Sequence, residues 1–213
     1  MEKLSQFDTF TDVVIGDSNR EAYKICNDAL NGGAYKYSPI IIYGECGTGK
    51  THLLKTMMKS LEKNCFYISG DDLIADVIDA VRNDNYREYI SSLEQHEFFL
   101  IDDYHIILGK EVTQEVLFRI IEHCISTGKL IILTSDKTIK ETSCYSKNLY
   151  SRIVSGVEIE LKQFDYKMRF DFVRKQAYLL GKAMANDVLQ KCAKEPANAF
   201  ELIGRVKAQY LEP

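Results

Sequence analysis

The sequence predicts an α/β domain, in which helices cover both faces of a parallel sheet, followed by a smaller all-helical subdomain. As far as about residue 160, short apolar runs alternate with longer amphipathic stretches, whereas only amphipathic stretches follow. Alternating strands and helices form crossover units, and such units build parallel sheets. A glycine-rich loop also joins the first apolar run to a helix. The pattern divides the chain into residues 1–162 and a helical lid at 163–213.

Four apolar runs have the length of buried strands and end at polar residues or glycine. They occupy 40–43, 65–68, 98–101 and 130–134, and residues 158–161 are expected to form one more strand. Apolar residues at spacings of three and four indicate helices between these runs. The expected helices are 19–30, 51–61, 72–81 and 113–126, then 166–180, 185–194 and 200–210 in the lid. Asp17, Ser18, Thr113 or their neighbours provide N-cap chemistry.

Composition limits the class of protein. No apolar run approaches the roughly 18 residues of a membrane span, and the first ten residues lack the features of a signal peptide. We therefore expect a cytoplasmic protein without membrane contacts. The net charge of −4 argues against general nucleic-acid binding. The six cysteines show no zinc-ligand spacing and indicate reduced thiols, with a redox switch at Cys46 as the functional alternative.

Residues 44–51 read G-E-C-G-T-G-K-T and match the phosphate-loop pattern G-x-x-x-x-G-K-[ST] between a strand and a helix. Glycines let successive backbone N–H groups point at phosphate oxygens, and a lysine supplies charge for the β and γ phosphates. The loop therefore predicts binding of ATP or ADP with Mg²⁺, the metal being held partly by a hydroxyl of the loop. The expected nucleotide contacts are Gly44, Gly47, Thr48, Gly49, Lys50, Thr51 and His52, with Thr51 also on the metal.

Two carboxylates follow the apolar strand at 98–101. Asp102 suits a water-bridged Mg²⁺ role, and Asp103 stands where a base that orients the attacking water is needed. In the alternative interpretation, both residues cap the next helix. This interpretation holds only if residues 44–51 are not a phosphate loop.

Several blocks of this sequence resemble the AAA+ domain of the bacterial replication initiator DnaA, from Phe7 to about Tyr210. The blocks are F-T-D-V-V-I-G-D-S-N-R at 10–20, G-T-G-K-T-H-L-L at 47–54, L-I-D-D at 100–103 with G-K-E at 109–111 and T-Q-E at 113–115, I-I-L-T-S-D at 131–136 and L-Y-S-R at 149–152. The resemblance implies an ATP-binding AAA+ fold whose N-terminal segment, including Val14 and Ile15, wraps the adenine.

The resemblance also assigns two catalytic roles. Asp136 would be the sensor 1 residue that helps position water, and Arg152 an arginine finger offered to ATP on a neighbouring subunit. Weak ATP hydrolysis that depends on assembly, and self-assembly with ATP, are therefore implied. In the alternative interpretation, Arg152 is an ordinary surface arginine near a strand start.

The sequence departs from the family at several positions. Phe200 stands where the sensor 2 arginine is expected, which should weaken nucleotide sensing or hydrolysis because phenylalanine cannot pair with a phosphate. Asn148 replaces a second basic residue of the finger segment. The chain stops at Pro213, so we expect no C-terminal helix-turn-helix domain and no sequence-specific binding of duplex DNA.

Single-stranded DNA contacts in the family come from helices equivalent to 72–96. Ile78 and Lys110 keep the apolar and basic character of contact positions, whereas Val112 replaces a basic residue. Weak binding of single-stranded DNA is therefore a hypothesis, and the alternative is an ordinary amphipathic helical hairpin.

Four functions remain open. The first is a short DnaA-type regulator that acts on replication initiation through full-length DnaA or another AAA+ protein, as Hda-like proteins do, although Met1 to Phe7 lacks their clamp-binding motif. The second is the ATPase domain of an initiator that self-assembles on ATP. A DnaC-type helicase loader and a non-hydrolysing nucleotide-binding adaptor are the other two.

Overall fold

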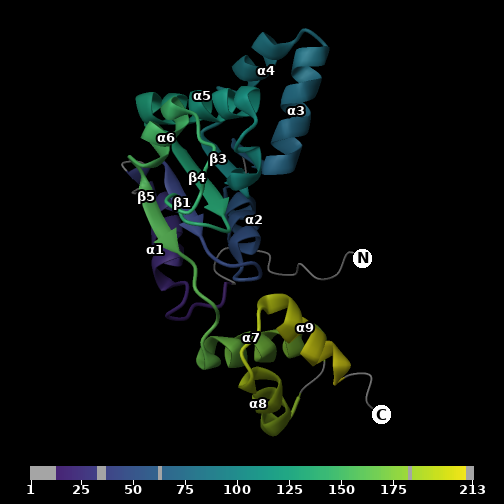
Figure 1. The fold of residues 1–213 in the computed structure, drawn as a ribbon. Helices are drawn as coiled ribbons and strands as arrows, with labels where there is room; N and C mark the ends of the chain where they lie inside the picture. The colour runs from purple at the N-terminus through teal and green to yellow at the C-terminus, as the bar shows by residue number, and fades with distance from the viewer. Residues whose placement is uncertain (1–12, 33–36, 62–63, 182–183, 210–213) are drawn as a thin grey trace.

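The computed structural model describes residues 13–32, 37–61, 64–181 and 184–209. One parallel sheet of five strands, in the order β2-β3-β4-β1-β5, forms the centre of the fold (Figure 1). The strands are β1 (Ile40–Tyr43), β2 (Cys65–Ser69), β3 (Phe98–Asp102), β4 (Leu130–Ser135) and β5 (Val157–Glu160). The expectations for Met1 to Phe7 and for residues 10–12 fall outside the described residues.

Helices cover both faces of the sheet. Because successive strand residues point to opposite faces, Ile40 and Ile42 share one core with α1 and α2, whereas Ile41 belongs to the core on the other face. The first layer contains α1 (Arg20–Leu30) and α2 (Lys50–Ser60). The second contains α3 (Gly70–Arg82), α4 (Tyr86–Leu93), the 3-10 helix η3 (Tyr104–Ile107), α5 (Glu111–Thr127) and α6 (Lys147–Ile153). The predicted α/β architecture is confirmed.

Three further helices pack around a core of their own (Figure 1). They are α7 (Tyr166–Leu179), α8 (Asn186–Lys194) and α9 (Ala199–Ala208). Val173, Ala193 and Leu202 are fully buried between them. The side chains of Asp165 and Asn198 cap α7 and α9 by accepting backbone N–H groups. We call α7 to α9 the lid helices; a domain boundary at residue 162 stays a prediction.

Some element boundaries differ from the sequence-based expectation. Helix α3 begins at Gly70, two residues early, because the Ser69 hydroxyl accepts the backbone N–H of Asp72. Helix α5 begins at Glu111 with Lys110 at its N-cap, so capping by Thr113, which is buried inside the helix, is wrong. Among the described residues, no helix is long and apolar enough to cross a membrane.

Candidate functional site

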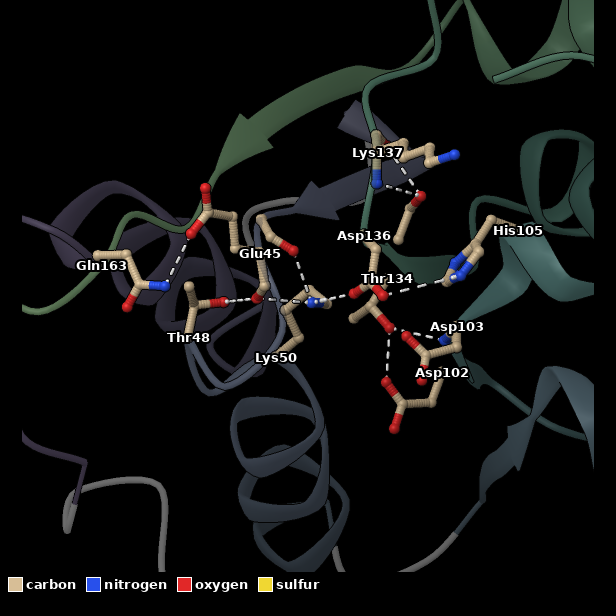
Figure 2. A network of polar contacts seen from close by, with 12 residues as sticks. Glu45, Thr48, Lys50, Asp102, Asp103, His105, Thr134, Asp136, Lys137 and Gln163 are labelled. Atoms are coloured by element: carbon tan, nitrogen blue, oxygen red, sulfur yellow. Dashed lines mark hydrogen bonds and ion pairs between the residues drawn. The ribbon is translucent and has the colours of Figure 1, made fainter. Parts of the chain in front are cut away.

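The candidate site lies at the carboxyl edge of three neighbouring strands. β1, β3 and β4 are adjacent and parallel, so the segments that follow them meet at one edge of the sheet. The glycine-rich loop follows β1, Asp102 ends β3, and Asp136 follows β4. This topology brings together Lys50, Asp102, Asp103 and Asp136, which lie close to one another in Figure 2.

The loop after β1 has a backbone that glycine alone adopts easily. Gly47 has φ +82° and Gly49 has φ +102°, both in the left-handed region. Gly49 is the N-cap residue of α2, and no side chain caps this helix. The first N–H groups of α2 therefore have no capping acceptor, which suits them to bind an anion. Thr48 is buried and steadies the loop through a 2.9 Å hydrogen bond from its hydroxyl to the Glu45 carbonyl.

The ammonium group of Lys50 is buried against the loop. Its Nζ donates to the carbonyls of Gly44 and Glu45 at 2.7 and 3.1 Å and lies 2.6 Å from Asp136 Oδ1. These three contacts match the three donors of an ammonium group. The lysine side chain is only 6% exposed, whereas the Asp136 side chain is 43% exposed. An incoming anion would therefore compete with Asp136 for the charge of Lys50.

Asp102 lies behind this pair in a hydrogen-bonded network. Its Oδ1 accepts the Thr134 hydroxyl at 2.5 Å, and its Oδ2 accepts the Tyr67 hydroxyl at 3.2 Å. The same Thr134 oxygen accepts the backbone N–H of Asp103 at 2.8 Å. Asp102 is 4% exposed, so the carboxylate is held rigidly at the base of the site.

Asp103 faces the site more directly. Burial first, then the carboxylates of Asp102 and Asp136, raise the pKa of Asp103, while His105 and Lys50 oppose the rise. A raised pKa favours proton acceptance, as a base that orients water needs. His105 Nε2 lies 4.0 Å from Asp136 Oδ2.

A cavity of about 640 Å³ opens between the loop and the lid helices. From the sheet side it is lined by Cys46, Gly47, Gly49, Lys50, Thr51, His52, Asp103 and Asp136. From the lid side it is lined by Phe164, Phe172, Gln176, Ala199, Phe200, Ile203, Gly204 and Lys207. Burial, with smaller effects of Lys175 and Lys59, lowers the pKa of His52 from 6.5 to about 4.

A smaller slot of about 30 Å³ shares Gly49, His52 and two phenylalanines with this cavity. Val14 and Thr48 line the slot, together with apolar residues that include Met168 of α7. Ile15 lines neither hollow and is 47% exposed. The candidate adenine contact at Val14 thus lines the slot beside the loop, whereas Ile15 lines neither hollow.

The lid helices touch the loop directly. The backbone N–H of Ala199 donates to the Gly47 carbonyl at 3.3 Å. A Cβ on Gly47 would lie 2.6 Å from the Cβ of Asn198, so this approach requires glycine. Phe200 follows at once, lines the cavity and is 72% exposed.

Arg152 lies outside this cavity. It is in the last turn of α6 and forms an ion pair with Glu122 of α5. Figure 1 shows α6 at the end of the sheet away from the lid helices. Arg152 is therefore not among the residues that line the cavity of its own chain, and its only described partner is Glu122.

The two candidate DNA contacts also lie elsewhere. Ile78 is an exposed residue of α3, and Lys110 precedes α5. Near them a shallow hollow of about 380 Å³ is lined by Val81, Tyr86, Glu111, Val112 and Glu115. Two glutamates and two valines therefore lie near the candidate contact positions.

The sequence analysis missed Thr134, Tyr67, His105 and the lid residues of the cavity other than Phe200. The signal for Thr134 was its place at the end of an apolar run, because parallel strands bring their last residues together. The other lid residues carried no such signal, since the sequence of a helix indicates which face it buries but not which element that face meets.

A family model for the bacterial DnaA ATPase domain matches residues 3–160 of this chain. The chain belongs to this family. DnaA of Aquifex aeolicus is 29% identical over 202 residues, covering 93% of this chain and 50% of the relative. DnaA of Herpetosiphon aurantiacus is 31% identical over 202 residues, covering 92% and 43%. The chain thus spans about half the length of the curated relatives it matches.

Solved DnaA structures have the same fold. The structure of AMPPCP-bound DnaA from Aquifex aeolicus superposes with a TM-score of 0.89 at 29% identity, covering 98% of this chain and 66% of that one. A replication initiator DnaA bound to AMPPCP and single-stranded DNA gives 0.88 at 29% identity, with the same coverage. A Thermotoga maritima RuvB variant, at 18% identity and TM-score 0.66, is similar in fold alone. The predicted AAA+ fold and the resemblance to DnaA are confirmed.

Proposed function

We propose that this DnaA-family chain binds ATP or ADP with Mg²⁺ and acts in, or regulates, initiation of chromosomal replication through contacts with full-length DnaA or another AAA+ protein. The observation that carries the proposal is the convergence of an uncapped helix N-terminus, the buried Lys50 and Asp136 on one cavity. Relatives solved with AMPPCP support the nucleotide assignment.

The cavity residues form two parts, one suited to the phosphate chain of a nucleotide and one suited to its base. The loop and Lys50 provide N–H donors and a positive charge for a phosphate chain. The slot at Val14, between the loop and α7, provides apolar walls for a base. The large cavity and the slot share His52, so one ligand can reach both.

The residues also fit a magnesium ion. Mg²⁺ prefers oxygen ligands and keeps several of its waters, and when bound it would neutralise charge on the β and γ phosphates. Thr51 would offer its hydroxyl from the cavity wall. Asp102, whose oxygens already accept hydrogen bonds from Thr134 and Tyr67, would act through water.

Hydrolysis would need a second molecule. Asp103 would accept the proton of the attacking water, and Asp136 would orient that water after Lys50 turns to the phosphates. Arg152 cannot serve its own cavity and would complete the site of a neighbour. We therefore expect weak hydrolysis by the isolated chain and faster hydrolysis in assemblies.

Phe200 supports one competing function, a nucleotide-binding adaptor that does not hydrolyse ATP. An exposed phenylalanine on the cavity wall offers no charge to a transition state. A second competing function is that of an isolated initiator domain that self-assembles on ATP. This function would depend on Arg152 as the finger. No described feature favours a DnaC-type helicase loader.

Binding of single-stranded DNA would be weak at most. Ile78 and Lys110 support it, and a DnaA relative is solved with single-stranded DNA. Glu111 and Glu115 near these positions would repel a phosphate backbone.

The experiment measures ATP turnover by this chain alone, by full-length DnaA alone and by the mixture. A mixture that exceeds the sum of the separate rates, and that loses the excess when this chain carries Arg152→Ala, supports the proposal. Tight ATP binding by this chain, with no turnover by the chain alone and a mixture rate equal to that of DnaA alone, would favour the adaptor.

A further inference from the structure

The charged side chains around the large cavity differ in whether they have a partner. Two lysines line it, Lys50 from the sheet side and Lys207 from α9, together with the carboxylates of Asp103 and Asp136. Lys50 is paired with Asp136. Within the described part of the chain, Lys207 takes part in no hydrogen bond or ion pair. The lid therefore presents one uncommitted positive charge to the cavity.

The position of Lys207 follows from the geometry of α9. Phe200, Ile203, Gly204 and Lys207 all line the cavity, and their spacing of three, four and seven residues places them on one face of the helix. No atom lies within 4 Å of a Cβ built on Gly204. The stripe thus runs from an aromatic ring to an ammonium group about 10 Å further along the helix axis, with no side chain at Gly204 between them.

The first turn of this helix is fixed to the phosphate loop. Ala199 donates its N–H to Gly47, and Asn198 packs against the same glycine. The orientation of the stripe relative to the loop is therefore set at one end, and the flexible four-carbon stem of a lysine extends its reach at the other.

We propose that Lys207 contacts the phosphate chain of the bound nucleotide and is the lid's cationic contact in a site whose first-turn position holds Phe200. The inference rests on the proposed nucleotide binding. Because Lys50 must serve Asp136 or the phosphates, a polyanion in this cavity gains from a second positive charge. Lys207 is exposed, so its contribution is modest and is screened by salt.

The test is calorimetric titration of the full chain with ATP and Mg²⁺. Lys207→Ala is expected to weaken ATP binding by about three- to tenfold, the range for one charge-assisted contact at an exposed site. Lys207→Arg should remain near wild type. Lys191→Ala, which removes an exposed lysine of α8 outside the cavity, is the matched control and should bind as wild type does.

Two further readouts separate a contact from a structural effect. The gap between wild type and Lys207→Ala should shrink as salt is raised from about 0.05 M to about 0.5 M. Phe200→Arg should restore affinity to Lys207→Ala, because it returns a positive charge to the same face of α9.

The outcomes are distinct. If wild type binds ATP and Lys50→Ala does not, but Lys207→Ala binds as tightly as Lys191→Ala, the inference about Lys207 is wrong and the proposed function stands. If wild type itself binds no ATP, both are wrong.

Discussion

The two walls of the cavity are built differently. On the sheet side, Lys50 donates to a loop carbonyl and pairs with Asp136, and Asp102 accepts a hydrogen bond from Thr134. These contacts form a dense polar network. On the lid side, phenylalanine and aliphatic residues dominate, and Lys207 is without a described partner. Substituting a residue of this network leaves a buried polar group without its hydrogen-bond partner, which is costly. Substituting an exposed lid residue such as Phe200 leaves no such group.

This difference separates two properties of the site. Under the proposed function, the sheet side supplies most of the groups that bind a phosphate chain, whereas hydrolysis and assembly depend on the lid side and on a neighbouring molecule. We therefore expect that substitutions on the lid side change hydrolysis and assembly more than they change nucleotide binding.

The largest expected effect comes from breaking the sheet side. Lys50→Ala should weaken ATP binding by about a thousandfold, since it removes a buried cation that makes several charge-assisted hydrogen bonds. Titration with ATP and Mg²⁺ measures the loss. Lys55→Ala, on the exposed face of the same helix, should have almost no effect. Retained tight binding in Lys50→Ala would show that the site is assigned wrongly.

The next effect concerns the molecule that would complete the site. Arg152→Ala should lower turnover in a mixture with full-length DnaA by about a hundredfold, because a trans arginine stabilises transition-state charge. Affinity of the isolated chain for ATP should stay within about twofold, since Arg152 lies outside the cavity. The control is Arg119→Ala, which removes an exposed arginine of α5. Equal losses of binding and turnover would contradict a trans role.

A third change tests the contact between the walls. Gly47→Ala should lower the free energy of unfolding by about 2 kcal/mol, because it adds a strained φ and a clash with Asn198. Gly181→Ala is the matched control, with φ +73° but no atom near the added Cβ, and should cost only about 1 kcal/mol. Equal losses of unfolding free energy for the two variants, measured by urea denaturation, would mean that the lid does not pack closely against the loop.

The smallest effect comes from His52, which lines the cavity and the slot. Its folded-state pKa is lowered from 6.5 to about 4, so below 6.5 the unfolded chain binds a proton that the folded chain refuses. Stability from this group is complete above that pH and is lost as the pH falls toward 4. Between about pH 7.5 and about pH 5.5 we expect a loss of about 1 kcal/mol, absent in His52→Gln. Identical pH profiles of urea unfolding would contradict the burial of His52.

Much of the fold could be predicted from the sequence because strand and helix periods differ. The site followed from the same pattern: Gly44 to Thr51 and Asp102 stand at strand ends, and parallel strands bring such ends together. The hydrogen bond from Thr134 to Asp102 needed the register of β3 against β4, which apolar runs do not specify.

The lid side could not be predicted in the same way. The amphipathic pattern of α9 shows that Leu202 and Val206 are buried, but not that the opposite stripe faces the loop. The substitution at Phe200 was visible in the sequence, whereas the place of Lys207 on the same wall depends on how α9 docks against Gly47.

The most direct test of the account is light scattering of this chain mixed with full-length DnaA, first with ADP and then with ATP and Mg²⁺. We predict a complex larger than either protein forms alone, present with ATP, reduced with ADP and absent when this chain carries Lys50→Ala. Unchanged masses of the two separate proteins in every condition would contradict a role through AAA+ subunit contacts.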